Sequence, residues 1–173
     1  MSNDPADLPV SLPTSTGRFV TLRLRPGEEV LESLQALVTR QGWAAVSIVS
    51  VVGSLTDAVI RYANQPGPSY RHGHFEVVAM SGTLEAAPPE GLEPAQPEGL
   101  EADSRPTLGG AHVHIGLSDG AGVMFGGHML PGCRVYTTLE IVLLILEELR
   151  FTRSHCDLSG YPELVITSRG TGE

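Results

Sequence analysis

Three histidines lie within a short stretch of this chain: His112 and His114 in the segment AHVHI, and His128 after two glycines. The segment alternates apolar and polar residues, so on a β-strand His112 and His114 share one face, with Cβ atoms about 6.6 Å apart. Imidazoles at that spacing can lean towards one metal ion and bind it at about 2.0–2.1 Å per nitrogen. We expect Gly126 and Gly127 to let the backbone turn back, which would bring His128 to the pair and complete a facial three-histidine site.

A site of this kind suits zinc or another divalent metal, held by neutral imidazoles. Three protein ligands leave a fourth position for water, a carboxylate or a bound ligand, and Glu76 is the carboxylate that we expect there. Zinc can lower the pKa of a bound water to about 7 and so support hydrolysis. Since no other nucleophile or general base is marked, a binding role is favoured, and a metal-dependent enzyme or small-molecule binder is the alternative. The other interpretation is that the histidines are solvated side chains on a polar strand face.

The remaining candidate ligands have less support. His72 and His74 repeat the spacing of the first pair, but loop histidines next to a strand are more often solvated than bound to metal. Cys133 follows a Pro-Gly turn, and we expect it to be buried because a free cysteine packs as a small apolar residue. We therefore expect neither group to belong to the metal site.

The composition is that of one folded domain. The chain has 173 residues, of which 41% are apolar and 18% charged, enough to bury a core without disulfides. Its net charge is −9, and its 11 basic residues, all arginine, form no run. This charge opposes DNA binding by the chain alone, because non-specific affinity comes from basic residues that neutralise phosphates. A leader peptide and an apolar run of about 20 residues are both missing, so we expect a cytoplasmic protein outside the membrane.

The chain order of the expected elements indicates an α+β fold. Residues 1–16 are read as a loose arm, 18–25 as a strand, and 28–40 as an amphipathic helix stopped by Gly42. Residues 46–52 and 55–63 are expected as two strands joined by a tight turn at Gly53 and Ser54. Residues 74–84 form the next strand, with Phe75, Val77 and Ala79 expected on one face.

The second half of the chain begins with a sharp change in composition. Residues 86–106 contain the sequence PEGLE twice, which indicates a flexible acidic surface insertion. Residues 111–117 and 122–125 are expected to form a hairpin around Ser118, Asp119 and Gly120. Periodicity alone leaves 134–146 open between a buried strand and a buried helix, and 163–166 closes the fold as a short strand. Many strands and one good helix favour a largely antiparallel sheet.

With these segments in order, the chain resembles the PPC domain, the "plants and prokaryotes conserved" domain, in its bacterial single-domain form. The segments that carry the resemblance are FVTLRLRPGE at 19–28, GSLTDAVIRYA at 53–63, FEVVAMSGT at 75–83, HVHIGLSD at 112–119, GGHMLPGC at 126–133 and GYPELV at 160–165. The resemblance covers residues 17–167 and leaves 168–173 as a tail.

This resemblance implies a twisted, mostly antiparallel sheet with one main helix, a strand at 134–146 and a homotrimer. Bacterial stand-alone relatives are described as predicted DNA-binding proteins, and some bear metal at the positions of His112, His114 and His128. In plants the domain follows an AT-hook and mediates self-association and contacts with transcription factors. This chain has no Arg-Gly-Arg-Pro core of an AT-hook, so the plant route to DNA is missing. The insertion at 86–106 precedes the histidine strand, and three roles are open for it: it shields the site, it gates the site, or it is inert.

Overall fold

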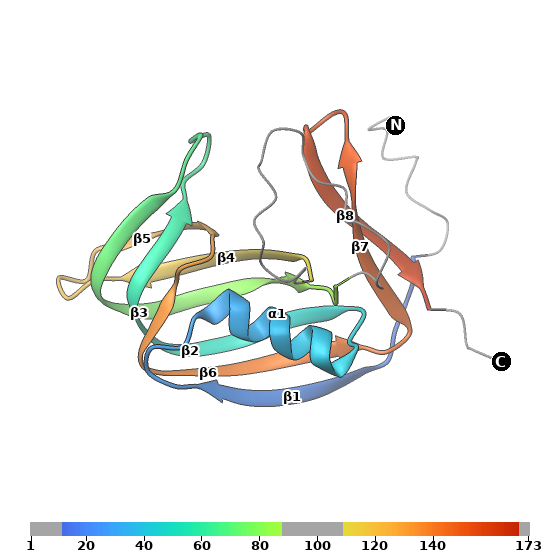
Figure 1. Ribbon diagram of the computed structural model, residues 1–173, viewed down its shortest axis with the longest axis horizontal. Coiled ribbons are helices and arrows are strands. Elements are labelled where there is room, and N and C mark those ends of the chain that lie inside the picture. Colours follow the sequence, from blue (N-terminus) through green and yellow to red (C-terminus); the bar gives the residue numbers. More distant parts are fainter. Residues whose placement is uncertain (1–11, 88–108, 170–173) are drawn as a thin grey trace.

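The computed structural model describes residues 12–87 and 109–169 (Figure 1). The main part of the predicted arm, insertion and tail, at 1–11, 88–108 and 170–173, lies outside the described residues. A six-stranded sheet holds β1 (Gly17–Leu24), β2 (Val46–Arg61), β3 (Ser69–Leu84), β4 (Ala111–Ser118), β5 (Met124–Met129) and β6 (Arg134–Leu146). The mostly antiparallel sheet and the strand at 134–146 are confirmed.

The helix α1 (Val30–Gln41) forms where its end signals predict it. The carboxylate of Glu29 accepts a hydrogen bond from the backbone N–H of Glu32, and Gly42 ends the helix in the left-handed conformation at φ +64°. Its apolar stripe packs into the core, and Figure 1 shows it lying across β2 and β6. Within the residues that the structure describes, no helix has the length and apolar character needed to cross a membrane.

The sheet curls so that its last strand returns to an earlier one. The strand order is β1-β6-β2-β3-β4-β5, and every adjacent pair is antiparallel. In addition, β5 pairs with the end of β2, where Ile60 faces Met129 and Arg61 faces His128. The end of β2 therefore lies beside the strand that carries the third histidine.

The predicted turn at Gly53 and Ser54 is wrong, because β2 runs through both residues as one strand. Gly53 has φ +147°, and a Cβ atom there would lie 2.0 Å from the backbone oxygen of Thr138 on β6. The pairing of β2 with β6 shifts register at this point. Glycine thus permits an irregularity and a close approach inside a long strand, and local sequence cannot distinguish that from a turn.

The predicted face of β3 is correct only in its first half. Phe75 and Val77 are buried as expected, but Ala79 is exposed and Met80 is buried in its place. The pairing of β3 with β4 shifts register between Val77 and Ala79. One extra residue at such a bulge reverses the alternation for the rest of the strand.

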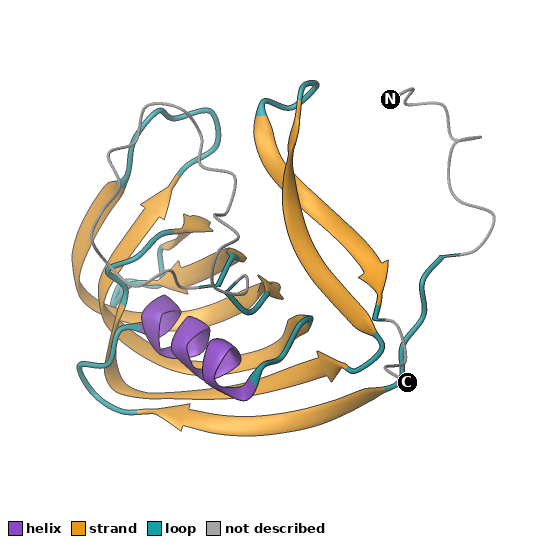
Figure 2. Cartoon of the chain, turned by 45° about the vertical axis from the view of Figure 1, so that its right-hand side comes forward, coloured by secondary structure: helices purple, strands orange, loops and turns teal. Residues whose placement is uncertain are grey.

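A hairpin of β7 (Leu149–Cys156) and β8 (Tyr161–Ser168) stands apart from the main sheet in Figure 2. Our sequence interpretation missed β7 and placed only the middle of β8. Phe151 anchors the base of the hairpin, packing against Ala45 and donating a 2.9 Å backbone hydrogen bond to Ala44. Arg153 adds a 3.0 Å ion pair to the buried Glu85, so the hairpin is fixed to the end of β3.

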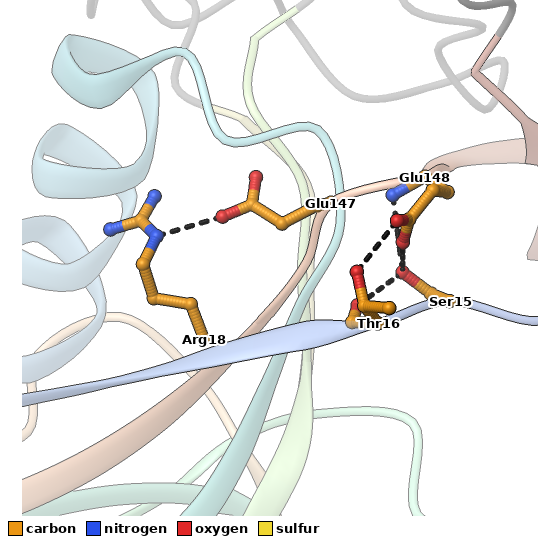
Figure 3. A network of polar contacts seen from close by, with 5 residues as sticks. All are labelled: Ser15, Thr16, Arg18, Glu147 and Glu148. Atoms are coloured by element: carbon orange, nitrogen blue, oxygen red, sulfur yellow. Dashed lines mark hydrogen bonds and ion pairs between the residues drawn. The ribbon is translucent and has the colours of Figure 1, made fainter.

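A polar network ties the start of β1 to the turn between β6 and β7 (Figure 3). Arg18 forms a 2.7 Å ion pair with Glu147. The carboxylate of Glu148 accepts hydrogen bonds from the hydroxyls of Ser15 at 2.5 Å and Thr16 at 2.6 Å. These hydroxyls, Ser15 first, hold the pKa of Glu148 below its usual range. The network joins segments that are distant in sequence at the base of the hairpin.

Candidate metal centre

The histidines lie on the hairpin of β4 and β5. The turn between the strands forms where it is predicted, but β5 runs over Met124–Met129 instead of the predicted 122–125 and includes His128. The turn is closed by Asp119, whose carboxylate accepts 2.9 Å hydrogen bonds from the backbone N–H groups of Ala121 and Val123. Val113 and Ile115 on β4 are buried, so His112 and His114 point away from the core on the opposite face.

The glycines before His128 do not turn the chain, and that expectation is wrong. Gly126 and Gly127 lie inside β5, and the turn comes earlier, around Asp119. A Cβ atom at Gly126 would lie 2.3 Å from the backbone oxygen of Ile115, and one at Gly127 would lie 2.6 Å from that of Arg61. The two glycines therefore let β5 fit closely between β4 and the end of β2.

The structure brings the three predicted histidines together. His128 is the direct cross-strand partner of His114, and the ring centroids of the three imidazoles lie 5.1, 5.2 and 5.5 Å apart. One ring nitrogen from each residue falls in a group whose members are all within 4.8 Å of one another. The Nε2 atoms of His112 and His114 are 3.2 Å apart.

This donor set fits a divalent metal. Two nitrogens bound to one tetrahedral zinc at about 2.0–2.1 Å lie about 3.3 Å from each other, close to the spacing of the Nε2 pair. Without a metal, the same 3.2 Å contact is a hydrogen bond between one protonated and one unprotonated imidazole nitrogen. His128 is the cross-strand partner of His114, and a nitrogen of its ring lies within 4.8 Å of ring nitrogens of the other two histidines.

The protonation of the cluster also suits metal binding. Burial, followed by the neighbouring His112 and Arg61, lowers the pKa of His128 to about 4. The pKa of His112 is lowered too, first by burial and then by Arg153. Both imidazoles are therefore neutral at pH 7 and keep a lone pair for a metal ion.

The predicted carboxylate ligand does not lie at the cluster. Glu76 faces Ser118, which is four residues along β4 from His114 and so about 13 Å away. The β3 residues opposite the histidines are Ser81 and Thr83. In this antiparallel register, Glu76 lies at one end of the β3–β4 pair and the histidines lie towards the other end. Among the described residues, the group of converging ligand atoms contains the three histidines and no carboxylate.

The model of the Plants and Prokaryotes Conserved (PCC) domain, also written PPC, matches residues 12–147. This chain belongs to the PPC-domain family. It is 34% and 35% identical to two proteins called "Bifunctional protein GlmU" from Synechococcus strains, over 91% and 93% of its own length. The chain spans 22% of the length of these relatives.

Solved structures agree with this PPC-domain fold. A hypothetical protein from Salmonella enterica is 43% identical with a TM-score of 0.76, covering 91% of this chain and 98% of the other. A metal-containing protein from Archaeoglobus fulgidus is 19% identical with a TM-score of 0.66, at 90% and 98% coverage. A "Putative DNA-binding protein" from Ralstonia eutropha is 21% identical with a TM-score of 0.64, at 84% and 89% coverage. The last two likenesses show the fold.

The weaker candidate ligands lie elsewhere in the PPC domain. The Nδ1 atom of His72 is 2.8 Å from a carboxylate oxygen of Asp57, and His74 stacks on Tyr136 with ring centroids 4.0 Å apart. Cys133 is fully buried as expected, and burial raises the pKa of its thiol to about 11. None of the three joins the histidine cluster.

A hollow of about 630 Å³ opens beside the histidines of this PPC domain. Besides the three histidines and the two β5 glycines, it is lined by residues from the end of β2, the following loop and the hairpin: Arg61, Tyr62, Ala63, Asn64, Gln65, Pro66 and Tyr161. Our sequence interpretation missed Arg61 and Tyr161. Local patterns carry no signal for them, because the β2–β5 pairing and the hairpin bring them to the site.

Proposed function

We propose that this PPC-domain chain is a binding or regulatory protein that holds one divalent metal ion, zinc in first place, on His112, His114 and His128. The observation that carries the proposal is the convergence of three imidazole nitrogens within 4.8 Å. The metal-containing neighbour from Archaeoglobus fulgidus supports it. Calorimetric titration of metal-free, untagged protein with Zn²⁺ tests it. We expect saturation at about one ion per chain, and the absence of saturable binding would contradict the proposal.

We further propose that the chain acts as a homotrimer. Large apolar side chains are exposed to solvent on five of the six strands of the sheet, among them Phe19 on β1 at 65% exposure and Val52 on β2 at 63%. Exposed apolar surface of this kind is typical of interfaces, and a closed ring of subunits would cover it.

The expected result is a light-scattering mass of three times the 18.4 kDa of one chain. Phe19→Glu combined with Val52→Glu should lower that mass to one chain, because the new carboxylates would be buried in the interface. Leu158→Glu is the control, since Leu158 is equally exposed but lies in the hairpin turn. A mass of one chain for the unaltered protein would contradict the proposal that it is a trimer.

In a regulatory role, the protein would bind DNA or a transcription-related protein. DNA binding is tested first. The Ralstonia eutropha neighbour carries a DNA-binding description, but the net charge of −9 works against phosphate contacts. We expect an electrophoretic mobility shift across a salt series to show weak DNA binding, or none, even at low salt. A tight shift that survives physiological salt would contradict this expectation and make direct DNA recognition the leading function.

Small-molecule binding or metal-dependent catalysis is the second candidate. The observation that favours it is the hollow beside the histidines, whose volume lies in the usual range for ligand sites. Three histidine ligands also leave a coordination position of zinc for water or a ligand group. A screen of simple esters and phosphoesters, with and without Zn²⁺, tests for turnover.

A further inference from the structure

The hollow is lined by the β4–β5 histidines and by residues from the end of β2, the following loop and the β7–β8 hairpin. In Figure 1 the turn that joins β2 to β3 and the β7–β8 hairpin rise on either side of β4. Arg61 comes from the β2 side, and Tyr161 comes from the first residue of β8. The hairpin lies beyond residues 12–147, the range that the family model matches.

Arg61 is held next to the histidines by two contacts. Its backbone pairs with that of His128, and its guanidinium carbon lies 5.6 Å from the centroid of the Tyr161 ring. Cation–π contact of this kind orients a guanidinium without neutralising it. Within 12–87 and 109–169, no carboxylate forms an ion pair with Arg61. Among these described residues, its hydrogen-bond donors are therefore left for a ligand.

A second cation adds to the local field. Arg153 lies on the other side of His112 and His114, in the adjoining hollow lined by Ser81 and Thr83. Its guanidinium makes 3.0 Å contacts to Glu85 and Thr83, so a carboxylate partner offsets part of its charge. The histidine cluster is thus flanked by two arginines in a chain whose net charge is −9.

We propose that this hollow binds a small molecule that carries an oxyanion, a carboxylate or a phosphate, on the guanidinium of Arg61. The planar fork of arginine matches the two oxygens of such a group. A second donor atom of the same molecule would then face the open coordination position of a metal ion held by the three histidines. This second contact rests on the proposed metal function, whereas the contact with Arg61 does not.

Calorimetry with inorganic phosphate and with acetate tests the inference on both metal-free and zinc-loaded protein. We expect phosphate binding to metal-free protein, strengthened several-fold by zinc. Arg61→Ala should weaken binding at least about tenfold, the loss typical of a hydrogen bond between charged groups, and Arg61→Lys should weaken it less. Arg23→Ala on the exposed face of β1 is the matched control and should leave the affinity unchanged. Comparing phosphate with acetate distinguishes the two oxyanion classes.

Zinc content of the same variants separates the two proposals. Arg61→Ala should still bind about one zinc per chain, because Arg61 is not a ligand in the cluster. Equal phosphate affinity in Arg61→Ala and the unaltered protein, or no binding of either probe, would overturn this inference while zinc binding stands. Absence of zinc uptake with phosphate still bound through Arg61 would overturn the metal centre and support the oxyanion site.

Discussion

Replacing His112 and His114 together by alanine is expected to lower the affinity for Zn²⁺ by more than about 100-fold in a calorimetric titration. Loss of a partner that merely orients a metal ligand already costs about 10–100-fold, and this variant removes two of three ligands. The fold should persist, because both side chains are exposed on the face of β4 that points away from the core. The metal-free variant should therefore melt close to the metal-free unaltered protein.

The chain offers a matched control for this experiment. His72 and His74 have the same spacing on the neighbouring strand β3 but lie outside the cluster. Alanine at both positions should leave zinc affinity unchanged. Zinc at about 100 times its dissociation constant should stabilise the control by about 2.7 kcal/mol and the His112/His114 variant by almost nothing. Equal zinc affinity in the two double variants would contradict the assignment of the ligands.

Gly126→Ala is expected to destabilise the protein by about 3 kcal/mol or more, measured by urea unfolding. The added Cβ would lie 2.3 Å from the backbone oxygen of Ile115, and backbone cannot move aside without breaking the β4–β5 pairing. The same disruption should displace His128 and weaken zinc binding. The effect arises from one methyl group within a strand.

Gly116→Ala is the control, because Gly116 faces Gly126 directly across the same hairpin. A Cβ atom there would have its nearest neighbours at 3.9 Å, an ordinary contact distance. We expect a change in the free energy of unfolding within about 1 kcal/mol. Similar losses in the two variants would show that the close fit of β5 at Gly126 does not determine stability.

The parts of the site that depend on local pattern were predictable from the sequence. Alternation placed His112 and His114 on one strand face, and turn chemistry at Asp119 placed the hairpin that carries them. The helix was predictable from local signals too, since the carboxylate of Glu29 caps its start and Gly42 ends it. The family resemblance gave the strand at 134–146, which periodicity alone left open.

The errors share a different cause, which is pairing between distant segments. Gly53 and Gly126 were interpreted as turn signals, yet each is required by a neighbouring strand that approaches too closely for a side chain. Glu76 was assigned to the site without knowledge of the β3–β4 register, which places it opposite Ser118. Arg61 lies near the histidines because β5 pairs with the end of β2, and Tyr161 lies there because the β7–β8 hairpin borders the same hollow.

The most direct test of the metal centre is the elemental content of untagged, unaltered protein, measured before and after incubation with Zn²⁺ and removal of the excess. The convergence of His112, His114 and His128 predicts about one divalent ion per chain, zinc in first place, and its loss in the His112/His114 double variant. Protein that contains no stoichiometric metal as purified, and retains none after incubation, would contradict the account.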